Sequence, residues 1–214
     1  MSDSKSINCK KCRRLGEKLF LKGDRCFGQK CAIVKRPYPP GPKSKRGGRR
    51  TSSEYSKELT EKQKLKNWYN LREKEFKNYV KKILQRGTKA DQDPTELLIR
   101  KLESRLDNVI FRLGFSKSRE QGRQFVSHRY FLVNGKATKA PSYQVKKGDT
   151  VAISPQKLKK IIIQNTIPFL KKYKAPDWLE LDSEKMEGRV VGTPTLEGAN
   201  PPAEISAIIE FYSR

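Results

Sequence analysis

The stretch from Leu102 to Ile153 constrains the fold of this chain more than any other part of its sequence. Its first half repeats apolar residues at helical spacing, and Arg, Lys, Ser, Asn or Gln fill most of the positions between them. Its second half places Asn134-Gly135 between two short apolar runs, a strong signal for a hairpin with a type I′ turn. The stretch therefore predicts two short helices, a tight hairpin and a third strand, with one basic face.

The residues before this stretch also have a helical pattern. Apolar side chains recur at helical spacing over residues 54–84, and the period slips near Asn70-Leu71, which indicates two helices rather than one rod. Many of these side chains are aromatic and could form either a core or a platform for stacking bases; the helix period favours a core. Asp93-Pro94-Thr95-Glu96 predicts another helix start, whose apolar stripe continues to Gly114.

The balance of charge points to a polyanionic partner. The 214 residues include 48 Lys and Arg against 23 Asp and Glu, a formal net charge of +25. Such an excess repels itself in a compact chain and is typical of proteins that bind nucleic acid. The hydrophobic fraction of 35 % is low and predicts small cores with extensions that order on a partner. No apolar run is long enough to span a bilayer, and MSDSKSINC is unlike a secretory signal, so we expect a soluble, cytoplasmic protein without a membrane partner.

The charge is concentrated near the N-terminus. Residues 1–50 hold 16 basic and 3 acidic residues, whereas residues 170–214 hold 6 and 8. The run KRPYPPGPKSKRGGRR at 35–50 combines cations with Pro and Gly, which exclude a regular helix. It is either a disordered basic tail or an extension that follows phosphates and replaces their counterions. The cations concerned are Lys43, Lys45, Arg46, Arg49 and Arg50.

Four cysteines, Cys9, Cys12, Cys26 and Cys31, are the only ones in the chain. Their spacing, C-x2-C-x13-C-x4-C, indicates metal binding before disulfides in a cytosolic protein. One structural Zn²⁺ held by four thiolates is the favoured interpretation. An iron–sulfur cluster and free thiols are the alternatives. None of these interpretations requires a catalytic metal with an open coordination position.

Several motifs together resemble one family. They are the four-cysteine segment, RPYPPG, SEYSKELTEKQKLKNWY, LESRLDNVIFRLGF, SRE-Q-RQFVSH, LVNGK, PSYQVKKGD, WLELD, KMEG and the terminal IIEFYSR. In this combination the chain resembles the S-four family of small ribosomal subunit proteins, in its bacterial form with an N-terminal metal site. The resemblance covers nearly the whole chain.

The resemblance implies an α+β fold in which a helical domain is interrupted by an inserted RNA-binding domain of two helices and a small antiparallel sheet. The boundaries we expect are 1–50 for the metal knuckle and basic extension and 51–93 for the helical domain, which 170–214 completes. Residues 94–169 would form the RNA-binding module. Gly122 departs from the family, which usually has a small helix former there, and Pro42-Lys43-Ser44-Lys45 stands where it usually has Gln-His-Gly. Glycine costs about 1 kcal/mol inside a helix, so at Gly122 we expect either packing that compensates for this cost or a close approach of the backbone to another group.

The implied function is structural. The family binds the 5′ domain of 16S rRNA early in assembly, lies beside small-subunit proteins three and five where mRNA enters, and in some members represses its own operon. The cations after PPG would lie closest to entering mRNA. The candidates for rRNA binding in the module are Arg105, Arg112, Lys117, Arg119, Arg123 and His128. For His128, a role in capping or hairpin packing competes with a contact to rRNA.

The residues themselves also favour RNA over catalysis. Arg119 and Arg123 are spaced to share one helical face, and guanidinium groups bind phosphate bidentately and stack on bases. An RNA-modifying enzyme or a synthetase with an accessory RNA-binding module is the alternative. That alternative requires a separate catalytic domain, and the sequence has no P-loop or dinucleotide fingerprint. We therefore expect neither an enzyme nor a small-molecule substrate.

Overall fold

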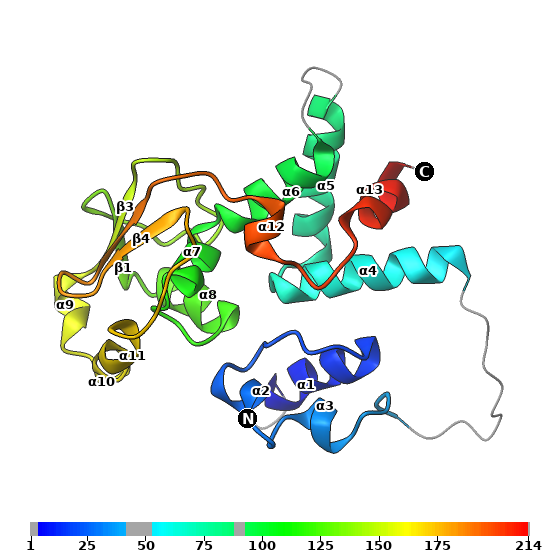
Figure 1. Cartoon of the computed structure of the whole chain (residues 1–214), viewed down its shortest axis with the longest axis horizontal. Helices are drawn as coiled ribbons and strands as arrows, with labels where there is room; N and C mark the ends of the chain where they lie inside the picture. Colours follow the sequence, from blue (N-terminus) through cyan, green and yellow to red (C-terminus); the bar gives the residue numbers. More distant parts are fainter. Residues whose placement is uncertain (1–3, 42–52, 88–92, 214) are drawn as a thin grey trace. The chain divides into compact units, whose positions relative to one another are not determined.

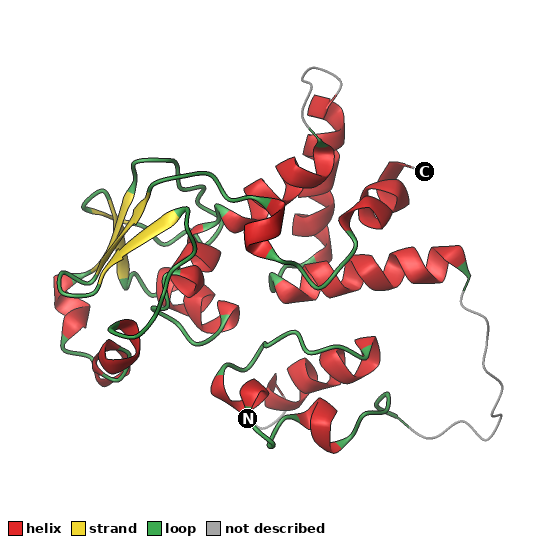
Figure 2. Ribbon diagram, viewed as in Figure 1, coloured by secondary structure: helices red, strands yellow, loops and turns green. Residues whose placement is uncertain are grey.

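The structure is a computed structural model that describes residues 4–41, 53–87 and 93–213 (Figure 1). The chain divides into two compact units, one formed by Met1–Thr95 with Pro201–Arg214 and the other by Glu96–Asn200. The first is built of helices, and the second combines helices with an antiparallel sheet, so the expected α+β class is confirmed (Figure 2). None of the helices in the described ranges has the length and apolar character needed to span a bilayer.

The core of the first unit lies between its longer helices. α13, at the end of the chain, packs against α4 and α5. Leu65 of α4 and Phe76 of α5 are fully buried, and the rings of Phe76 and Tyr212 lie 6.2 Å apart. The aromatic stripe predicted over residues 54–84 therefore contributes to a core. The helices of this unit are α1 (Ser4–Leu15), α2 (Asp24–Phe27), α3 (Ala32–Lys35), α4 (Glu54–Trp68), α5 (Glu73–Gly87) and α13 (Ile205–Ser213).

Two helices occupy the region in which the apolar period slips, as predicted. The Ser53 side chain caps α4 by accepting a hydrogen bond from the backbone N–H of Ser56 at 3.3 Å. After α4 ends, Asn70 adopts a φ of 53°, a left-handed conformation that Asn tolerates better than most residues. The chain thereby turns into α5.

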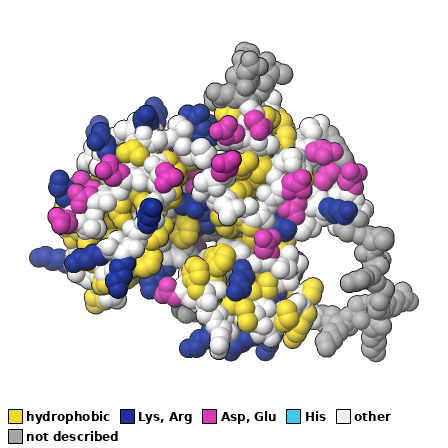
Figure 3. Space-filling view, in the orientation of Figure 1, with side chains coloured by type: hydrophobic (Ala, Val, Ile, Leu, Met, Phe, Trp, Pro, Cys, Tyr) yellow, Lys and Arg dark blue, Asp and Glu magenta, His cyan; other side chains and the backbone are white. Residues whose placement is uncertain are grey.

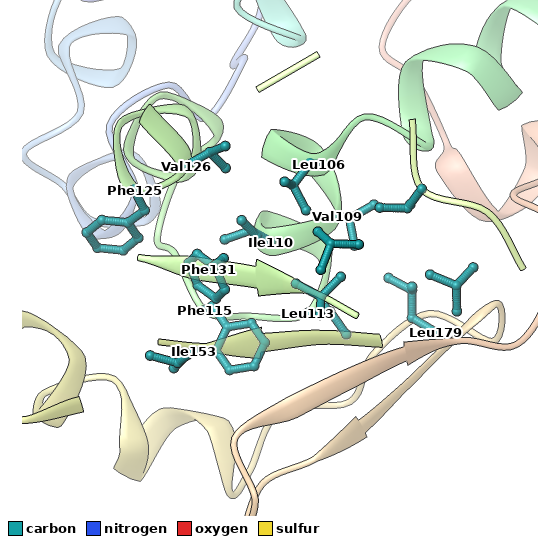
Figure 4. Close-up of a cluster of buried hydrophobic side chains, with 14 of the residues drawn as sticks. Leu106, Val109, Ile110, Leu113, Phe115, Phe125, Val126, Phe131, Ile153 and Leu179 are labelled. Carbon is teal, nitrogen blue, oxygen red and sulfur yellow. The ribbon is translucent and has the colours of Figure 1, made fainter. Parts of the chain in front are cut away.

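The second unit places helices against one face of a five-stranded antiparallel sheet, with strand order β2-β1-β3-β5-β4. Side chains of α7, α8 and the strands converge on a shared apolar core that includes Ile110, Phe125, Phe131 and Leu179 (Figure 4). The helices are α6 (Pro94–Glu103), α7 (Leu106–Arg112), α8 (Arg119–Ser127), α9 (Pro155–Leu158), α10 (Ile161–Gln164), α11 (Ile167–Leu170) and α12 (Leu196–Ala199). The strands are β1 (Phe131–Val133), β2 (Lys136–Ala137), β3 (Thr150–Ile153), β4 (Leu179–Asp182) and β5 (Glu187–Val190).

The predicted hairpin and third strand are both present. Asn134 and Gly135 have φ values of 49° and 76°, as a type I′ turn requires, and they join β1 to β2. β3 pairs with β1 on its other side, with Val133 opposite Val151. The turn residues Asn134 and Gly135 were therefore sufficient to predict the β1–β2 hairpin.

The predicted boundary after residue 169 was wrong, because β4 and β5 complete the sheet. β5 pairs with β3, with Thr150 opposite Arg189, and β4 pairs with β5. Trp178, Leu179 and Val190 contribute to the apolar core of this unit. Residues 170–200 therefore belong to the second unit, and of the segment 170–214 only Pro201–Arg214 returns to the helical unit.

The helix predicted from Asp93 to Gly114 is divided into two. The backbone N–H of Leu106 donates to the carbonyl of Tyr143 at 2.8 Å, and that of Val145 donates to the carbonyl of Ser104 at 2.9 Å. In one continuous helix, the N–H of Leu106 and the carbonyl of Ser104 would instead form hydrogen bonds within the helix. α6 and α7 therefore meet at a break, and Gly114, with a φ of 82°, follows the end of α7.

Candidate nucleic-acid interface and metal centre

α7 and α8 approach each other at a single glycine. The Ser118 side chain caps α8 by accepting a hydrogen bond from the N–H of Gln121. Inside α8, a Cβ added at Gly122 would lie 2.7 Å from the carbonyl oxygen of Asp107 in α7. The close approach expected at Gly122 is therefore present, and it brings polar side chains of the two helices together.

Glu103, at the end of α6, is the first of two carboxylates that gather the predicted arginines. Its side chain is fully buried and accepts two hydrogen bonds from Arg112, each at 2.9 Å. Asn108 donates to the same carboxylate at 2.7 Å, and Nη2 of Arg119 lies 4.0 Å from it. Charge-assisted bidentate bonds of this kind fix the orientation of a guanidinium group as well as its position.

Asp107 is the second carboxylate. It accepts two hydrogen bonds from Arg105, at 3.0 and 2.8 Å, and lies 3.9 Å from Nη1 of Arg123. Arg119 donates to the side-chain oxygen of Asn108 at 2.7 Å, which links the two halves. We call this set the arginine–carboxylate cluster, and its members are Glu103, Arg105, Asp107, Asn108, Arg112, Arg119 and Arg123.

The arginines of the cluster differ in how far a ligand could reach them. The exposed fraction of the side chain is 1 % for Arg105, 7 % for Arg119, 17 % for Arg112 and 29 % for Arg123. A phosphate could approach the guanidinium of Arg123 from solvent, whereas that of Arg105 is enclosed. The sequence therefore placed the four arginines together correctly, but it could not show that two of them are buried.

The other candidates lie outside the cluster. Lys117 and His128 are both exposed. His128 is the C-cap residue of α8, and its backbone N–H donates to the carbonyl of Gln124. Lys43, Lys45, Arg46, Arg49 and Arg50 lie outside the described residues.

Sequence reasoning missed three residues of this region. Glu103 and Asp107 are acidic and were not considered as parts of a binding face, although each interrupts an apolar stripe, a position where a buried charge needs a partner. Arg129 follows His128, is exposed and has a φ of 55°. In the view of Figure 3, Lys and Arg side chains are interspersed with Asp and Glu, so on that face the charge excess does not form one continuous patch.

The four predicted metal ligands come together in the first unit. They line one small cavity of about 20 Å³ between α1, α2 and the start of α3. All four lie in the described part of the chain, three of them are buried, and none forms a disulfide. Burial raises the pKa of the Cys12 and Cys26 thiols, and the other cysteine sulfurs raise it further.

The cavity suits a metal that prefers sulfur. Its donors are four thiols. Lys22 also lines this cavity, and its ammonium nitrogen is buried and makes no hydrogen bond within the described structure. Thiolates bound to a metal would supply negative charge that compensates the positive charge of Lys22. Among the described residues, it is Glu54, Glu58 and Glu210, not the cysteines, whose ligand atoms all lie within 4.8 Å of one another. A bound metal would therefore draw the sulfurs closer together.

Comparisons with known proteins identify the family to which the chain belongs. Residues 4–103 match the model of the ribosomal protein S4/S9 N-terminal domain, and residues 104–151 match that of the S4 domain. The small ribosomal subunit protein uS4 of Halothermothrix orenii is 42 % identical over 214 residues, which is 100 % of both chains. That of Desulforapulum autotrophicum is also 42 % identical over the full length, and that of Thermus thermophilus is 41 % identical over 96 % of each chain. This chain therefore belongs to the family of small ribosomal subunit protein uS4.

Proposed function

We propose that the Glu96–Asn200 unit binds the 5′ domain of 16S rRNA and that this binding nucleates assembly of the small ribosomal subunit. Membership of the uS4 family makes the chain a non-enzymatic structural constituent of that subunit, with an RNA-binding S4 domain. Beyond family membership, we propose which RNA domain this chain binds and which of its residues bind that RNA.

The arginine–carboxylate cluster carries this proposal. It gathers four guanidinium groups around two carboxylates, so the cluster itself is cationic. Two positive charges beside each buried carboxylate favour a polyanion at the surface of the cluster. Structured RNA presents closely spaced phosphates and 2′-hydroxyl groups, which a rigid cationic surface recognises by shape.

The members of the cluster would have different roles. Arg123, the most exposed of the four arginines, would contact phosphate, and the exposed side chains of Lys117 and Arg129 would add further phosphate contacts. Arg105 and Arg119 would act as positioning residues, because their guanidinium groups are buried and hydrogen-bonded to Asp107 and Asn108. This division refines the equal roles assigned to these arginines from the sequence.

The remaining partners are proposed on charge and resemblance alone. We place mRNA, where it enters the subunit, beside the basic extension at 43–50, and small-subunit proteins three and five next to it. Repression of its own operon would use the same RNA-binding face. Each of these contacts depends on residues or partners beyond the described chain.

We also propose one metal centre held by Cys9, Cys12, Cys26 and Cys31, with Zn²⁺ favoured and an iron–sulfur cluster as the alternative. The shared cavity and the burial of three cysteines support it. When bound, the metal would cross-link α1, α2 and the start of α3, a stabilisation that this short polar segment needs.

Binding of 16S 5′-domain RNA at increasing salt tests the main proposal. The logarithm of the association constant should fall steeply and linearly with the logarithm of salt concentration. Replacing Arg123 and Lys117 together with Gln should reduce the slope by about two, because each cation that no longer neutralises a phosphate lowers it by roughly one. Lys185→Gln is the matched control, because Lys185 is 76 % exposed in the turn between β4 and β5. A nearly flat salt dependence, or equal slopes for both variants, would contradict the proposal.

A further inference from the structure

Lys22 carries a buried positive charge for which the described residues provide no hydrogen-bond partner. Its ammonium nitrogen is buried and has no hydrogen-bond partner, and no ion pair is formed with it within the described ranges. The backbone N–H of the same residue donates to Sγ of Cys26 at 3.3 Å. Lys22 also lines the cavity that the four cysteines share. The backbone of Lys22 therefore contacts the cysteine site directly, and its positive charge acts on the same site by lowering the pKa of Cys26.

A lysine in such a position needs an explanation. Removing an isolated ammonium group from water is strongly unfavourable unless an opposite charge compensates it. Lys62 shows the usual solution in this chain, since its buried side chain lies 2.8 Å from a carboxylate oxygen of Glu73. For Lys22, the thiol of Cys26 is a group whose negative form the ammonium charge favours. Carboxylates near it in the sequence do not compensate it: Glu17 pairs with Lys64 at 3.3 Å, and Asp24 is exposed.

We propose that Lys22 is the counter-charge of the metal–thiolate centre, an inference that rests on the metal proposed above. Four thiolates around a divalent metal carry a net charge of −2, and the positive charge of Lys22, a residue that lines the same cavity, would reduce it. The backbone N–H of Lys22, already directed at Cys26, would act with it by stabilising the thiolate form of that sulfur. Lys22 is thus a positioning and charge-balancing residue rather than a ligand.

The size of the expected effect follows from other metal sites. Partners outside the ligand shell typically contribute 10–100-fold to metal affinity. We therefore expect Lys22→Met, which keeps the length of the side chain and removes its charge, to lower metal affinity about 10-fold or more. Lys22→Arg keeps the charge and should retain affinity much closer to that of the unchanged protein.

The experiment uses the full chain and Co²⁺ as a spectroscopic probe, followed by competition for Zn²⁺ with a chromophoric chelator. Tetrahedral thiolate coordination gives Co²⁺ a sulfur-to-metal charge-transfer absorption that reports binding directly. Lys30→Met is the matched control, because Lys30 is exposed and adjoins Cys31 in the sequence. Lys30→Met removes a positive charge close to the cysteines in sequence, but not the charge of a residue that lines the cavity. Circular dichroism at saturating metal shows whether each variant folds.

Two outcomes would overturn the inference while leaving the metal centre in place. One is equal affinity in Lys22→Met and Lys30→Met. The other is an equal loss in Lys22→Arg and Lys22→Met, which would show that the site needs the shape of lysine rather than its charge. If the unchanged protein gave no charge-transfer absorption with Co²⁺ and bound no Zn²⁺, the proposed metal centre and the proposed role of Lys22 would both be contradicted.

Discussion

Arg105 and Lys22 both carry enclosed positive charges, but within the described part of the chain only Arg105 is paired with a carboxylate. Arg105 makes two hydrogen bonds to the buried carboxylate of Asp107. Lys22 faces cysteine thiols, whose pKa is raised by burial at Cys12 and Cys26. A buried pair that is complete stabilises its surroundings without a ligand, whereas an uncompensated ammonium group destabilises them. The comparison leads us to expect that the Glu96–Asn200 unit can form before RNA binds, while the cysteine segment would depend on the proposed metal.

Removal of the metal should have the largest effect, because it should destabilise the cysteine segment and leave the Glu96–Asn200 unit folded. A chelator should strip residues 8–35 of amide protection against hydrogen exchange, because structural metals contribute on the order of 10 kcal/mol to small sites of this kind. The Glu96–Asn200 unit should keep its protection, since its core contains no proposed ligand. Hydrogen exchange read by mass spectrometry, with and without chelator, measures both parts at once. Equal protection of the cysteine segment in the two samples would show that it folds without a metal.

Arg105→Met should have the next largest effect, and on stability rather than on RNA contact. It leaves the buried carboxylate of Asp107 without its bidentate partner, which typically costs about 3–5 kcal/mol. Because only 1 % of the Arg105 side chain is exposed, the slope of RNA affinity against salt should stay unchanged. Arg123→Gln is the counterpart, expected to change the slope with little loss in the free energy of unfolding. If Arg105→Met lowered the slope as Arg123→Gln does, the assignment of separate roles would be wrong.

Local signals in the sequence predicted much of the fold. The Asn134-Gly135 turn, the slip near Asn70 and the start at Asp93 each depend on short-range backbone chemistry, and all three are present. The gathering of the four arginines and of the four cysteines was also predictable, because helical spacing and cysteine spacing are properties of the sequence.

Long-range pairing and burial could not be predicted in the same way. The addition of β4 and β5 to the sheet depends on contacts between residues such as Thr150 and Arg189, far apart in sequence. The break between α6 and α7 depends likewise on the carbonyl of Tyr143. Whether an arginine faces solvent or a buried carboxylate is decided by packing, so Arg105 and Arg123 look equivalent until the structure separates them.

The smallest expected effect concerns Glu73, whose ion pairs with Lys62 and Lys66 (2.8 and 2.9 Å) are partly open to solvent. Burial alone would raise the pKa of Glu73, but hydrogen bonds from the two ammonium groups outweigh it and lower the pKa from 4.5 to about 2. Because the pKa is lowered in the folded state, the stabilisation is complete above pH 4.5 and is lost as the pH falls toward about 2. With 47 % of the side chain exposed, solvent screening limits it to about 1 kcal/mol. Glu73→Gln should remove this acid-dependent loss from the free energy of unfolding, and Glu180→Gln, at an exposed position of β4, should retain it. Identical pH profiles for the two variants would mean that the ion pairs of Glu73 contribute nothing measurable to the stability of this protein.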